Sequence, residues 1–443
     1  MKVTSVRRVG VPLAMLAILG AALTGCSSGS AGAGKVGTAD GVVTITGPIT
    51  DKDATLLEQS WSSWEKANNI TIKYTGSKDF EEQIGGSAQQ GNASDLAIFA
   101  QPGLIGDLAS RGYLQKLPST VEKNVKSNFP AAWGKYTTFS GSNYAAPLLA
   151  NINGWVFYSP TQLRDWGLSV PKTWSDLYLL TQNIQSKVSG PVWCDGFSAN
   201  AASGAGGTDW IEDLVLRQDG AKVYDQWVSH KIPFDDPRIK RAFNDAAEIL
   251  QDKNYTNAGI GGVKSVNTAT TTDVANAMLD GKCALTHQDS TFVGALANAD
   301  TTGGSKSNVS PNGDFWAFPL PPFTDTSIPI TGGGDFVAAF SNDADTIKVQ
   351  KYLSSTAWAE SRVKLGGVIS PDPQVPLDDA GSPLLQLSAA TLQDQRTVFR
   401  FDASDLMPSV VGSGAFLTGV VNWVNGQPTD KVLASIDAAW PSN

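Results

Sequence analysis

The sequence is poor in the side chains that most often bind metals or act as catalytic bases. Its 443 residues include only 2 histidines and 3 cysteines. Zinc sites built on clusters of histidine and cysteine are therefore not available. A serine–histidine–aspartate triad would have to use His230 or His287, and neither lies beside a Gly-x-Ser-x-Gly motif. These shortages argue against a zinc enzyme and against a serine hydrolase.

Long hydrophobic runs are also missing, apart from one near the start. Residues 9–23 are mostly apolar, but this run is shorter than the roughly 20 residues that span a bilayer comfortably. It follows a start with three basic residues and ends in small residues, which is typical of a secretory signal peptide. We therefore predict a signal peptide over residues 1–25 and an exported protein.

The end of this segment, Leu23-Thr24-Gly25-Cys26, resembles the bacterial lipobox. The resemblance implies lipid transfer to the Cys26 thiol, cleavage before it, and a lipid anchor on the outer face of the cytoplasmic membrane (the periplasmic side in a cell with two membranes). An ordinary signal peptide followed by an incidental cysteine is the alternative. Residues 26–41 are rich in serine, glycine and alanine and cannot bury apolar area, so they are predicted to be a flexible tether.

Positive charge is scarce in the rest of the chain. Without residues 1–25 it has 30 basic and 42 acidic side chains, a net charge of −12. Binding of nucleic acid and adhesion to anionic lipid both need basic patches, so neither is expected. The 13 tryptophans are many for a chain of this size. In an exported protein, some of them are expected to line a ligand site.

Two cysteines, Cys194 and Cys283, remain once Cys26 is set aside. The oxidising conditions outside the cytoplasm favour a disulfide between them. Two buried free thiols are the alternative.

The first part of the chain alternates between strand and helix patterns. Strands are predicted at 41–49, 70–76 and 94–103, and helices at 51–69 and 78–91. Asp51 or Asp53 is expected to cap the first helix. This alternation with short links predicts a parallel sheet with helices on its faces.

Later segments suggest a second part of the fold. The apolar, β-rich run at 144–160 is a candidate crossing between two lobes, in keeping with the chain length. A helix is predicted at 171–187, within a long α-rich middle. Strands follow at 314–323 and 330–340, and the last third of the chain reads as helical.

Four blocks of the sequence carry a family resemblance. They are "KDFEEQI" with "DLAIFAQPGLIGDLASRGYLQKL" (78–84 and 95–117), "VWCDGF" with "GTDWIEDLVLRQDGAKVYDQW" (192–197 and 207–227), "GGGDFVAAF" (332–340) and "RFDASDLMPSVVGSGAF" (400–416). In this order, and over nearly the whole mature chain, they resemble the carbohydrate-binding lipoproteins of bacterial ABC importers, of the alpha-glucoside type, in the extracellular solute-binding protein family 1.

This resemblance implies an α/β fold with two discontinuous lobes, of the periplasmic-binding-protein type II, joined by hinge strands. A sugar, an alpha-glucoside or another oligosaccharide, would bind in the cleft between the lobes and pass to an ABC import permease. No catalysis, cofactor or metal is implied, and a monomer is expected. The implied lobe one is 42–148 with 315–368, and the implied lobe two is 149–314 with 369–443.

The sequence departs from the family pattern at two places. Family members often have Glu-Ser where this chain has Ser198-Ala199, and Gly-Trp where it has Gly204-Ala205. A histidine-containing stretch of the family reads "HQDSTF" here, at 287–292. A stacking ring and an acidic contact are therefore not carried over, and the identity of the sugar stays open.

Sugars present apolar C–H faces and a rim of hydroxyls, so a sugar site needs flat aromatic rings and converging carboxylates and amides. Candidate rings are Trp193, Trp210 and Phe292. Candidate hydroxyl partners are Asp79, Gln101, Asp209, Gln288, Asp289, Asp335, Asp402 and Asp405. The neighbouring Phe80, Ser198, Gly333 and Gly334 complete the predicted ligand-binding set.

Each of these residues also has a plain structural interpretation. The rings could be core residues, and the carboxylates could lie on a solvated surface or cap helices. Asp209 in particular precedes "WIEDLVLR" and could cap that helix. The "GGGD" segment permits close backbone approach to a ligand, or it could be a tight turn; no Lys-Ser or Lys-Thr follows it as in a phosphate loop.

Two other functions are alternatives to sugar binding. A secreted glycosidase could use Asp402 and Asp405 as acid and base, but residues three apart are clustered locally and do not flank a glycosidic bond from two sides. A two-lobe binder of a peptide or polyamine is the other alternative. Sugar hydrolysis assays distinguish the first of these, and a ligand screen distinguishes the second.

Overall fold

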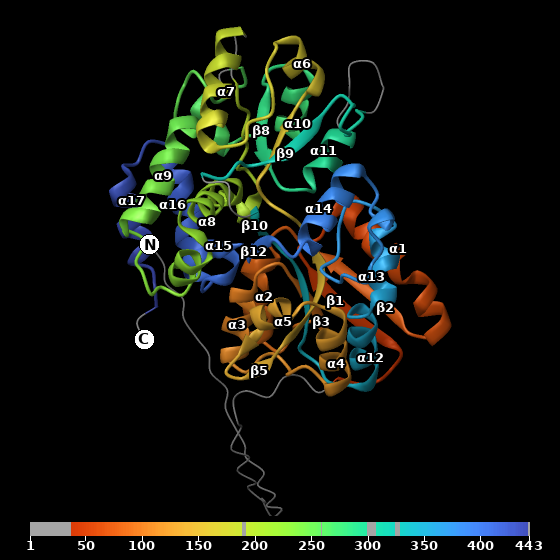
Figure 1. Ribbon diagram of the computed structural model, residues 1–443. Helices are drawn as coiled ribbons and strands as arrows, with labels where there is room; N and C mark the ends of the chain where they lie inside the picture. The colour runs from red at the N-terminus through yellow and green to blue at the C-terminus, as the bar shows by residue number, and fades with distance from the viewer. Residues whose placement is uncertain (1–36, 188–191, 258, 299–306, 324–327, 442–443) are drawn as a thin grey trace, which may run out of the picture. The chain divides into compact units, whose positions relative to one another are not determined.

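The structure is a computed structural model that describes residues 37–187, 192–257, 259–298, 307–323 and 328–441 (Figure 1). The predicted signal peptide, Cys26 and most of the predicted tether lie outside these residues. Within the described ranges, no helix is both long enough and apolar enough to cross a membrane.

The first sheet has five strands in the order β2-β1-β3-β11-β6. These strands are β1 (Val42–Gly47), β2 (Thr71–Gly76), β3 (Leu96–Phe99), β6 (Ala145–Ala150) and β11 (Gly334–Ala339). β1 pairs in parallel with β2 and β3, as the sequence pattern predicts. β11 comes from far along the chain and lies antiparallel between β3 and β6, so this part of the fold is discontinuous in sequence.

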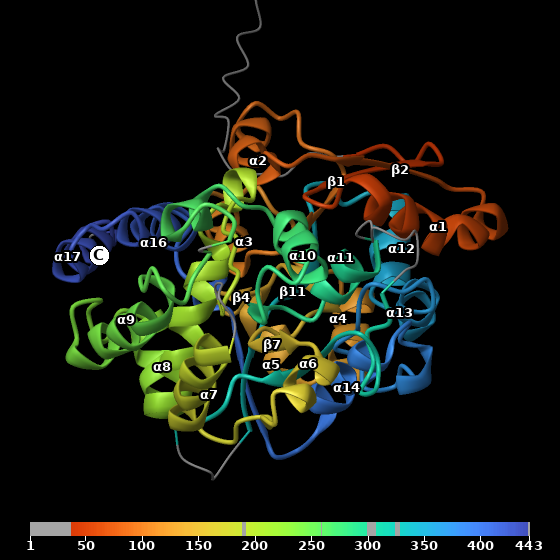
Figure 2. The same ribbon diagram turned by 90° about the horizontal axis from the view of Figure 1, so that it is seen from above.

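Seven helices flank this sheet or its connections: α1 (Asp51–Asn68), α2 (Phe80–Gln89), α3 (Pro102–Ser110), α4 (Ser119–Asn128), α5 (Ala131–Tyr136), α12 (Ala344–Leu353) and α13 (Thr356–Val363). A hairpin of β4 (Thr138–Phe139) and β5 (Ser142–Asn143) precedes β6. Figures 1 and 2 show α1, α12 and α13 grouped beside β1 and β2. The apolar strands are covered on their faces, as is usual for a mostly parallel sheet.

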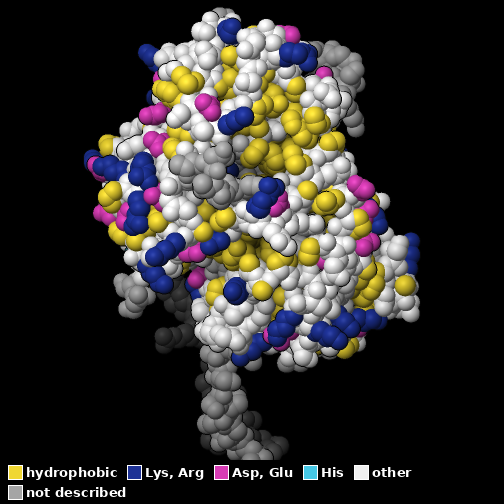
Figure 3. Space-filling view, viewed as in Figure 1, with side chains coloured by type: hydrophobic (Ala, Val, Ile, Leu, Met, Phe, Trp, Pro, Cys, Tyr) yellow, Lys and Arg dark blue, Asp and Glu magenta, His cyan; other side chains and the backbone are white. Residues whose placement is uncertain are grey.

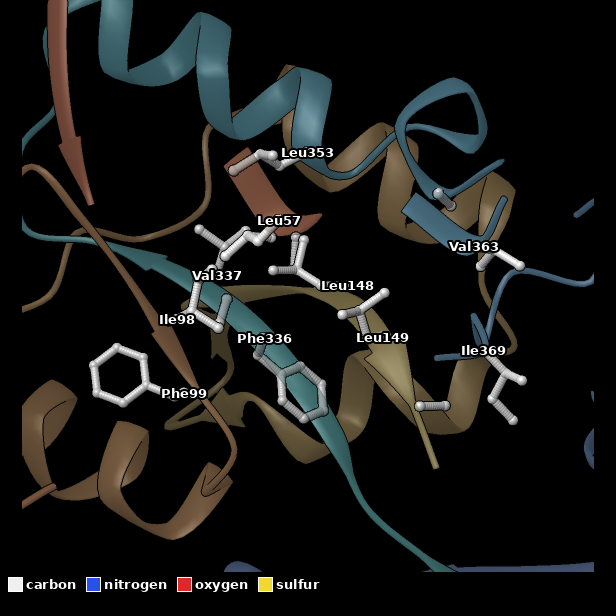
Figure 4. Close-up of a cluster of buried hydrophobic side chains, with 14 of the residues drawn as sticks. Leu57, Ile98, Phe99, Leu148, Leu149, Phe336, Val337, Leu353, Val363 and Ile369 are labelled. Carbon is white, nitrogen blue, oxygen red and sulfur yellow. The ribbon is translucent and has the colours of Figure 1, made fainter. Parts of the chain in front are cut away.

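The core beside the first sheet contains residues from two segments of the chain, the segment up to β6 and the segment from β11 to α13. In Figure 4, Leu57 of α1 and Leu353 of α12 lie close to Ile98, Val337 and Leu148 of the strands. All five side chains are at most 1% exposed. Burial of each such side chain contributes roughly 1.5 to 3 kcal/mol, so this cluster binds the two segments together.

The expected cap of α1 is wrong. Thr50 occupies the position before the helix, and no side chain caps the first turn. Asp51 has a positive φ of 57°, and its carboxylate pairs with Lys78 at 3.1 Å. The Asp51 carboxylate therefore forms an ion pair that links the start of α1 to Lys78, just before α2.

The second sheet has three antiparallel strands with β7 (Trp155–Tyr158) in the centre, between β8 (Leu285–Gln288) and β9 (Trp316–Pro319). β9 falls within 315–368, the range predicted for lobe one, yet it pairs with β7. The predicted boundary at residue 315 therefore does not match the strand pairing.

The remaining helices are α6 (Pro160–Asp165), α7 (Trp174–Lys187), α8 (Ala205–Val228), α9 (Pro237–Leu250), α10 (Thr271–Leu279), α11 (Phe292–Asn298), α14 (Pro383–Gln393), α15 (Ala403–Leu406), α16 (Leu417–Val424) and α17 (Thr429–Asp437). Most of them accompany the second sheet, but α14 buries Leu384, Leu385 and Ala389 in the hydrophobic cluster that includes the first sheet. Short turns of tighter or wider helix occupy Asn200–Ala202, Val263–Asn267, Leu377–Asp379 and Val410–Phe416. Figures 1 and 2 show α8, α9, α16 and α17 packed as one group.

The chain passes between the two sheets three times. The first crossing, 151–154, joins β6 to β7; the second, described over residues 320–323 and 328–333, includes β10 (Ile328–Gly332) and leads into β11. The third follows β12 (Thr397–Phe401), which pairs in parallel with β10. The crossings therefore lie side by side, with two of them joined by a strand pair.

The predicted disulfide is confirmed. Cys194 and Cys283 are bonded, with their Cα atoms 5.7 Å apart. The backbone N–H of Cys194 also donates to the carbonyl of Leu285 at 2.9 Å, which places the 192–195 segment beside β8. The bond thus closes a loop with a sequence separation of 89 residues within the part of the chain around the second sheet.

Replacing both cysteines by serine (Cys194→Ser with Cys283→Ser) should lower the free energy of unfolding by about 2 to 4 kcal/mol, because the unfolded chain regains the freedom that the closed loop removes. Urea unfolding under oxidising conditions measures this loss. The wild type in reducing buffer should approach the variant. Equal unfolding midpoints for the variant and the oxidised wild type would show that the bond does not stabilise the fold.

Candidate functional site

Helix α8 carries a row of charged side chains on one face. Asp209, Glu212, Asp213 and Arg217 are spaced three, four and eight residues from the first, which brings them to the same side of a helix. The helix begins at Ala205 after Gly204, so Asp209 lies inside it and is not its cap, contrary to that interpretation of the sequence.

Three carboxyl groups meet at the first of these positions. Side-chain oxygens of Asp209, Glu212 and Asp402 lie within 4.8 Å of one another. Glu212 accepts hydrogen bonds from the backbone N–H groups of Ala403 at 2.7 Å and Ser404 at 3.0 Å, which fixes the start of α15. Among the described residues this is the group whose spacing could hold a metal ion, but its oxygens already accept hydrogen bonds from N–H groups.

Asn153, in the first crossing, joins two of these carboxylates. Its Nδ2 donates to Asp209 Oδ1 and to Asp402 Oδ2, each at 3.1 Å. Asn151 Nδ2 in turn donates to Asn153 Oδ1 at 2.7 Å. Hydrogen bonds between side-chain amides therefore lead from Asn151 through Asn153 to the carboxylates of the cluster.

A second buried network begins one helical turn further along α8. Asp213 accepts hydrogen bonds from Arg217, from the hydroxyl of Thr331 and, at 2.9 Å, shares one with His287 Nε2. Burial alone would raise the pKa of Asp213, but the charge of Arg217 and the bond to His287 outweigh it and hold that pKa below its usual value. Arg217 Nε also donates to the carbonyl of Leu320 at 2.8 Å.

Gly154 is required at this point of the first crossing. Its φ is +75°, and a Cβ there would lie 2.2 Å from Asp213 Oδ2 and 3.0 Å from Arg217 Nη2. Only glycine permits this close approach of the crossing to the buried ion pair.

Further carboxyl groups come from other elements. Asp335 opens β11 beside a β-bulge, and burial raises its pKa to about 7. Burial also raises the pKa of Asp405 in α15 well above its usual value, and the charges of Asp402, Glu81 and Asp335 raise it further. The pKa values of Glu81 and Asp289 are likewise raised by burial. The chain of α15 also lies against α3, since a Cβ on Gly103 would be 3.1 Å from the carbonyl of Asp405.

A cavity of about 280 Å³ is lined by one of these carboxyl groups, Glu81. One wall is made by α2 and α3, and the other by the segments around residues 200 and 410. The lining residues are Glu81, Glu82, Gln101, Leu104, Ala201, Ala202, Ser409, Val410, Ser413 and Gly414. The hydroxyl of Ser413 donates to Gln101 Oε1 at 3.0 Å across it. The walls combine carboxylates and an amide with small and apolar side chains.

The predicted aromatic platforms lie in the interior. Trp193 and Trp210 are both 0% exposed, with ring centroids 5.4 Å apart, and Phe292 and Phe80 are 2% and 3% exposed. Trp193 Nε1 donates to Thr181 Oγ1 at 3.1 Å, and the Trp210 ring lies 4.3 Å from that of His287. None of these four rings offers a face at the surface, so the structure gives no support to their role as platforms.

The other predicted residues are dispersed around the cluster. Asp79 is exposed at the start of α2, Gln288 donates to Thr286 Oγ1 at 3.1 Å, and the N–H of Ser198 donates to Ala269 at 3.0 Å. A Cβ on Gly333 would lie 2.9 Å from Asn151 Oδ1, and one on Gly334 2.3 Å from the carbonyl of Leu149. These glycines are needed for contact with the chain of β6 and the first crossing.

Several residues of the cluster are absent from the sequence-based set. They are Glu81, Asn151, Asn153, Glu212 and Asp213. The helical spacing within "TDWIEDLVLR" could have indicated Glu212 and Asp213, because it repeats on the face of Asp209. Nothing in the local sequence distinguishes Asn153, whose role depends on three distant segments.

The face of the molecule in Figure 3 shows basic side chains spread among acidic and apolar ones. The whole chain is acidic by composition, which offers little for binding to a polyanion.

Replacing Trp210 by alanine should destabilise the fold by about 3 to 5 kcal/mol, because the ring is fully enclosed and leaves a cavity. Urea unfolding measures the loss, with Trp166→Ala, a partly buried ring, as the control expected to lose less. A Trp210→Ala protein as stable as the wild type but unable to bind ligand would restore the platform role.

Comparison with known proteins agrees with this architecture. The model of the bacterial extracellular solute-binding protein family matches residues 42–359. The osmoprotective compounds-binding protein GgtB of Synechocystis sp. is 31% identical over 401 residues, covering 90% of this chain and 92% of GgtB. The alpha-glucosides-binding periplasmic protein AglE of Rhizobium meliloti is 31% identical over 412 residues, covering 90% of this chain and 87% of AglE.

Among solved structures, the bacterial solute receptor AcbH, described as having an exclusive preference for β-D-galactopyranose, superposes with a TM-score of 0.72. The two chains are 18% identical, and the match covers 90% of this chain and 97% of AcbH, which shows a shared two-lobe α/β fold. The family model matches residues 42–359, most of this chain, and GgtB and AglE are each 31% identical to it. The chain therefore belongs to the bacterial extracellular solute-binding proteins.

Proposed function

We propose that this solute-binding protein captures a sugar between its lobes and delivers it to an ABC import permease. The relatives support this: AglE binds alpha-glucosides by its name, and AcbH is described with a galactose preference. An alpha-glucoside or another oligosaccharide is the ligand class that we infer. The protein acts by binding alone and needs no cofactor.

The cavity of about 280 Å³ is the observation that carries this proposal, because its walls come from α2 and α3 on one side and from the segments around residues 200 and 410 on the other. Glu81, Glu82 and Gln101 line it from the first side, and Ser409 and Ser413 line it from the second. A sugar hydroxyl donates to such groups, and each bond gains strength where water is excluded. Gln101 adds an amide that can both donate and accept.

The lobe division follows the sequence-based ranges with one change. We assign residues 42–148 and the part of 315–368 after Leu320 to lobe one. We assign residues 149–314 and 369–443 to lobe two, together with β9, because β9 pairs with β7. The three crossings then form the hinge, and a sugar that contacts both lobes would favour the closed form. Asp209, Asp289, Asp402 and Asp405 would act from lobe two.

The placement outside the cytoplasm follows from the family, and its finer details are proposals. We infer that residues 1–25 are removed, that a lipid on Cys26 holds the protein at the membrane, and that it works as a monomer. The lipobox-like Leu23-Thr24-Gly25-Cys26 supports the anchor.

A thermal-shift screen tests the ligand class directly. Maltose, sucrose, trehalose and raffinose should include at least one stabilising ligand, since a ligand at 100 times its dissociation constant adds about 2.7 kcal/mol. Spermidine and a peptide mixture serve as ligands of other classes. Asp405→Asn should reduce the shift without unfolding the protein. Stabilisation by spermidine or peptides alone would replace the sugar by a ligand of another class.

Asp335 should make stability depend on pH. Its folded pKa, about 7, exceeds its unfolded value of 3.8, so the folded state binds more protons between these values. The free energy of unfolding should therefore fall as pH rises from about 4 to about 7 and level off above. Relative to Asp335→Asn, the wild type should lose about 2 to 4 kcal/mol over this range.

Urea unfolding at intervals between pH 4 and pH 8 measures this difference. Asp394→Asn is the control, because the pKa of Asp394 is lowered to about 2 and does not change its charge in this range. Parallel pH profiles for the wild type and Asp335→Asn would show that Asp335 titrates normally.

A further inference from the structure

We propose that Asn153 is a positioning residue of the ligand site, whose side-chain amide holds Asp209 and Asp402 side by side for the ligand. The proposal rests on the proposed function only in its last step, the use of these two carboxylates by a sugar. The holding itself is a property of the protein without ligand.

The geometry uses both protons of one amide nitrogen. Asn153 Nδ2 lies 3.1 Å from Asp209 Oδ1 and 3.1 Å from Asp402 Oδ2, and the residue is 3% exposed. The opposite orientation would place the amide oxygen, which is an acceptor, against two carboxylates. An ionised carboxylate can only accept hydrogen bonds, so neither contact would then be a hydrogen bond. A bond to a carboxyl group that is ionised is charge-assisted and stronger than a bond between neutral groups.

The amide is also prevented from turning away. Its Oδ1 accepts from Asn151 Nδ2 at 2.7 Å, and its backbone N–H donates to the carbonyl of Thr331 at 2.9 Å. The N–H of Asn151 donates to the carbonyl of Gly333 at 3.1 Å. The first crossing thus fixes Asn153 to β10 and to the glycines that precede Asp335.

Asn153 matters because the surroundings of the two carboxylates are acidic. Within the described part of the chain, no lysine or arginine forms an ion pair with Asp209, Glu212 or Asp402, and Arg217 is bonded to Asp213. Burial, followed by the neighbouring acids, raises the pKa of Asp209 and of Glu212 well above the usual values. The charged and titratable groups that face the cluster are Glu212, Asp213, Arg217 and Tyr224 of α8, His287 and Asp289 at β8, and Asp405 of α15.

Removal of the two N–H donors should leave the ionised form of this pair of carboxyl groups without the donor that they share. The pair then takes up a further proton. This changes the arrangement that Asp209, on α8, and Asp402, after β12, present to a ligand. The remaining donor to Asp402, the Ser404 hydroxyl at 3.2 Å, contacts the other carboxylate oxygen and cannot replace the link.

The test without ligand compares Asn153→Leu, which keeps the size and removes the donors, with Asn257→Leu. Asn257 is equally buried, but its Nδ2 donates to the carbonyl of Asp195 and to the Ser265 hydroxyl, not to carboxylates. Potentiometric titration of the folded proteins should show about one additional proton bound near neutral pH in Asn153→Leu and none in Asn257→Leu. The free energy of unfolding should fall more steeply with rising pH in the first variant only.

A titration of Asn153→Leu that matches the wild type would overturn the proposal, because a merely structural asparagine lowers stability without changing proton binding. Asn153→Ala, which also removes the donors and adds no titratable group, replaces the leucine variant if that variant does not fold. It should carry the same change in titration.

The binding test uses maltose, followed by calorimetry at pH 5 and pH 8. Asn153→Leu should bind at least tenfold more weakly than the wild type at both pH values. Asn153→Asp should bind weakly at pH 8 and recover in part at pH 5, where a protonated carboxyl group can donate one hydrogen bond. Unchanged affinity in both variants would overturn the positioning role. If the wild type binds no sugar, the proposed function fails, while the titration still decides the role of Asn153.

Discussion

The structure depends on the buried ionisable groups of α8 and on the backbone that satisfies them. A charged or polar side chain inside a protein is costly unless it is hydrogen-bonded, so Glu212, Asp213 and Arg217 must find partners. They find them in segments that pass between the two sheets. Glu212 bonds the start of α15, Asp213 bonds Thr331, and Arg217 bonds Leu320.

All three crossings are therefore attached to one helix. The first crossing approaches through Gly154 and Asn153, the second through Leu320 and Thr331, and the third through Tyr224, whose hydroxyl donates to the carbonyl of Phe401 at 3.0 Å. Bonds to charged groups are worth about 1.5 to 3 kcal/mol each, and loss of one partner leaves the other unpaired in the interior. This coupling gives the hinge a defined resting arrangement, and it places carboxyl groups where the crossings meet.

Two buried tryptophans, Trp193 and Trp210, pack beside this polar network. Trp210 lies against His287, which bonds Asp213, and Trp193 packs edge-on against Trp210. The same segment continues into the disulfide of Cys194 with Cys283, beside β8. Rigid rings and a covalent bond thus support the polar network.

The local elements and the class of fold can be predicted from the sequence. The alternation of strand and helix in the first part predicts β1 to β3 with α1 and α2, because hydrophobic period and turn residues are local signals. The two cysteines and their compartment predict the disulfide, and ordered blocks indicate the family. The sheet that β9 joins, the burial of Trp193 and Trp210, and the link that Asn153 makes between Asp209 and Asp402 are known from the folded chain alone. Those outcomes depend on packing and desolvation among segments far apart in sequence, and the spacing of residues along the chain carries no record of such contacts.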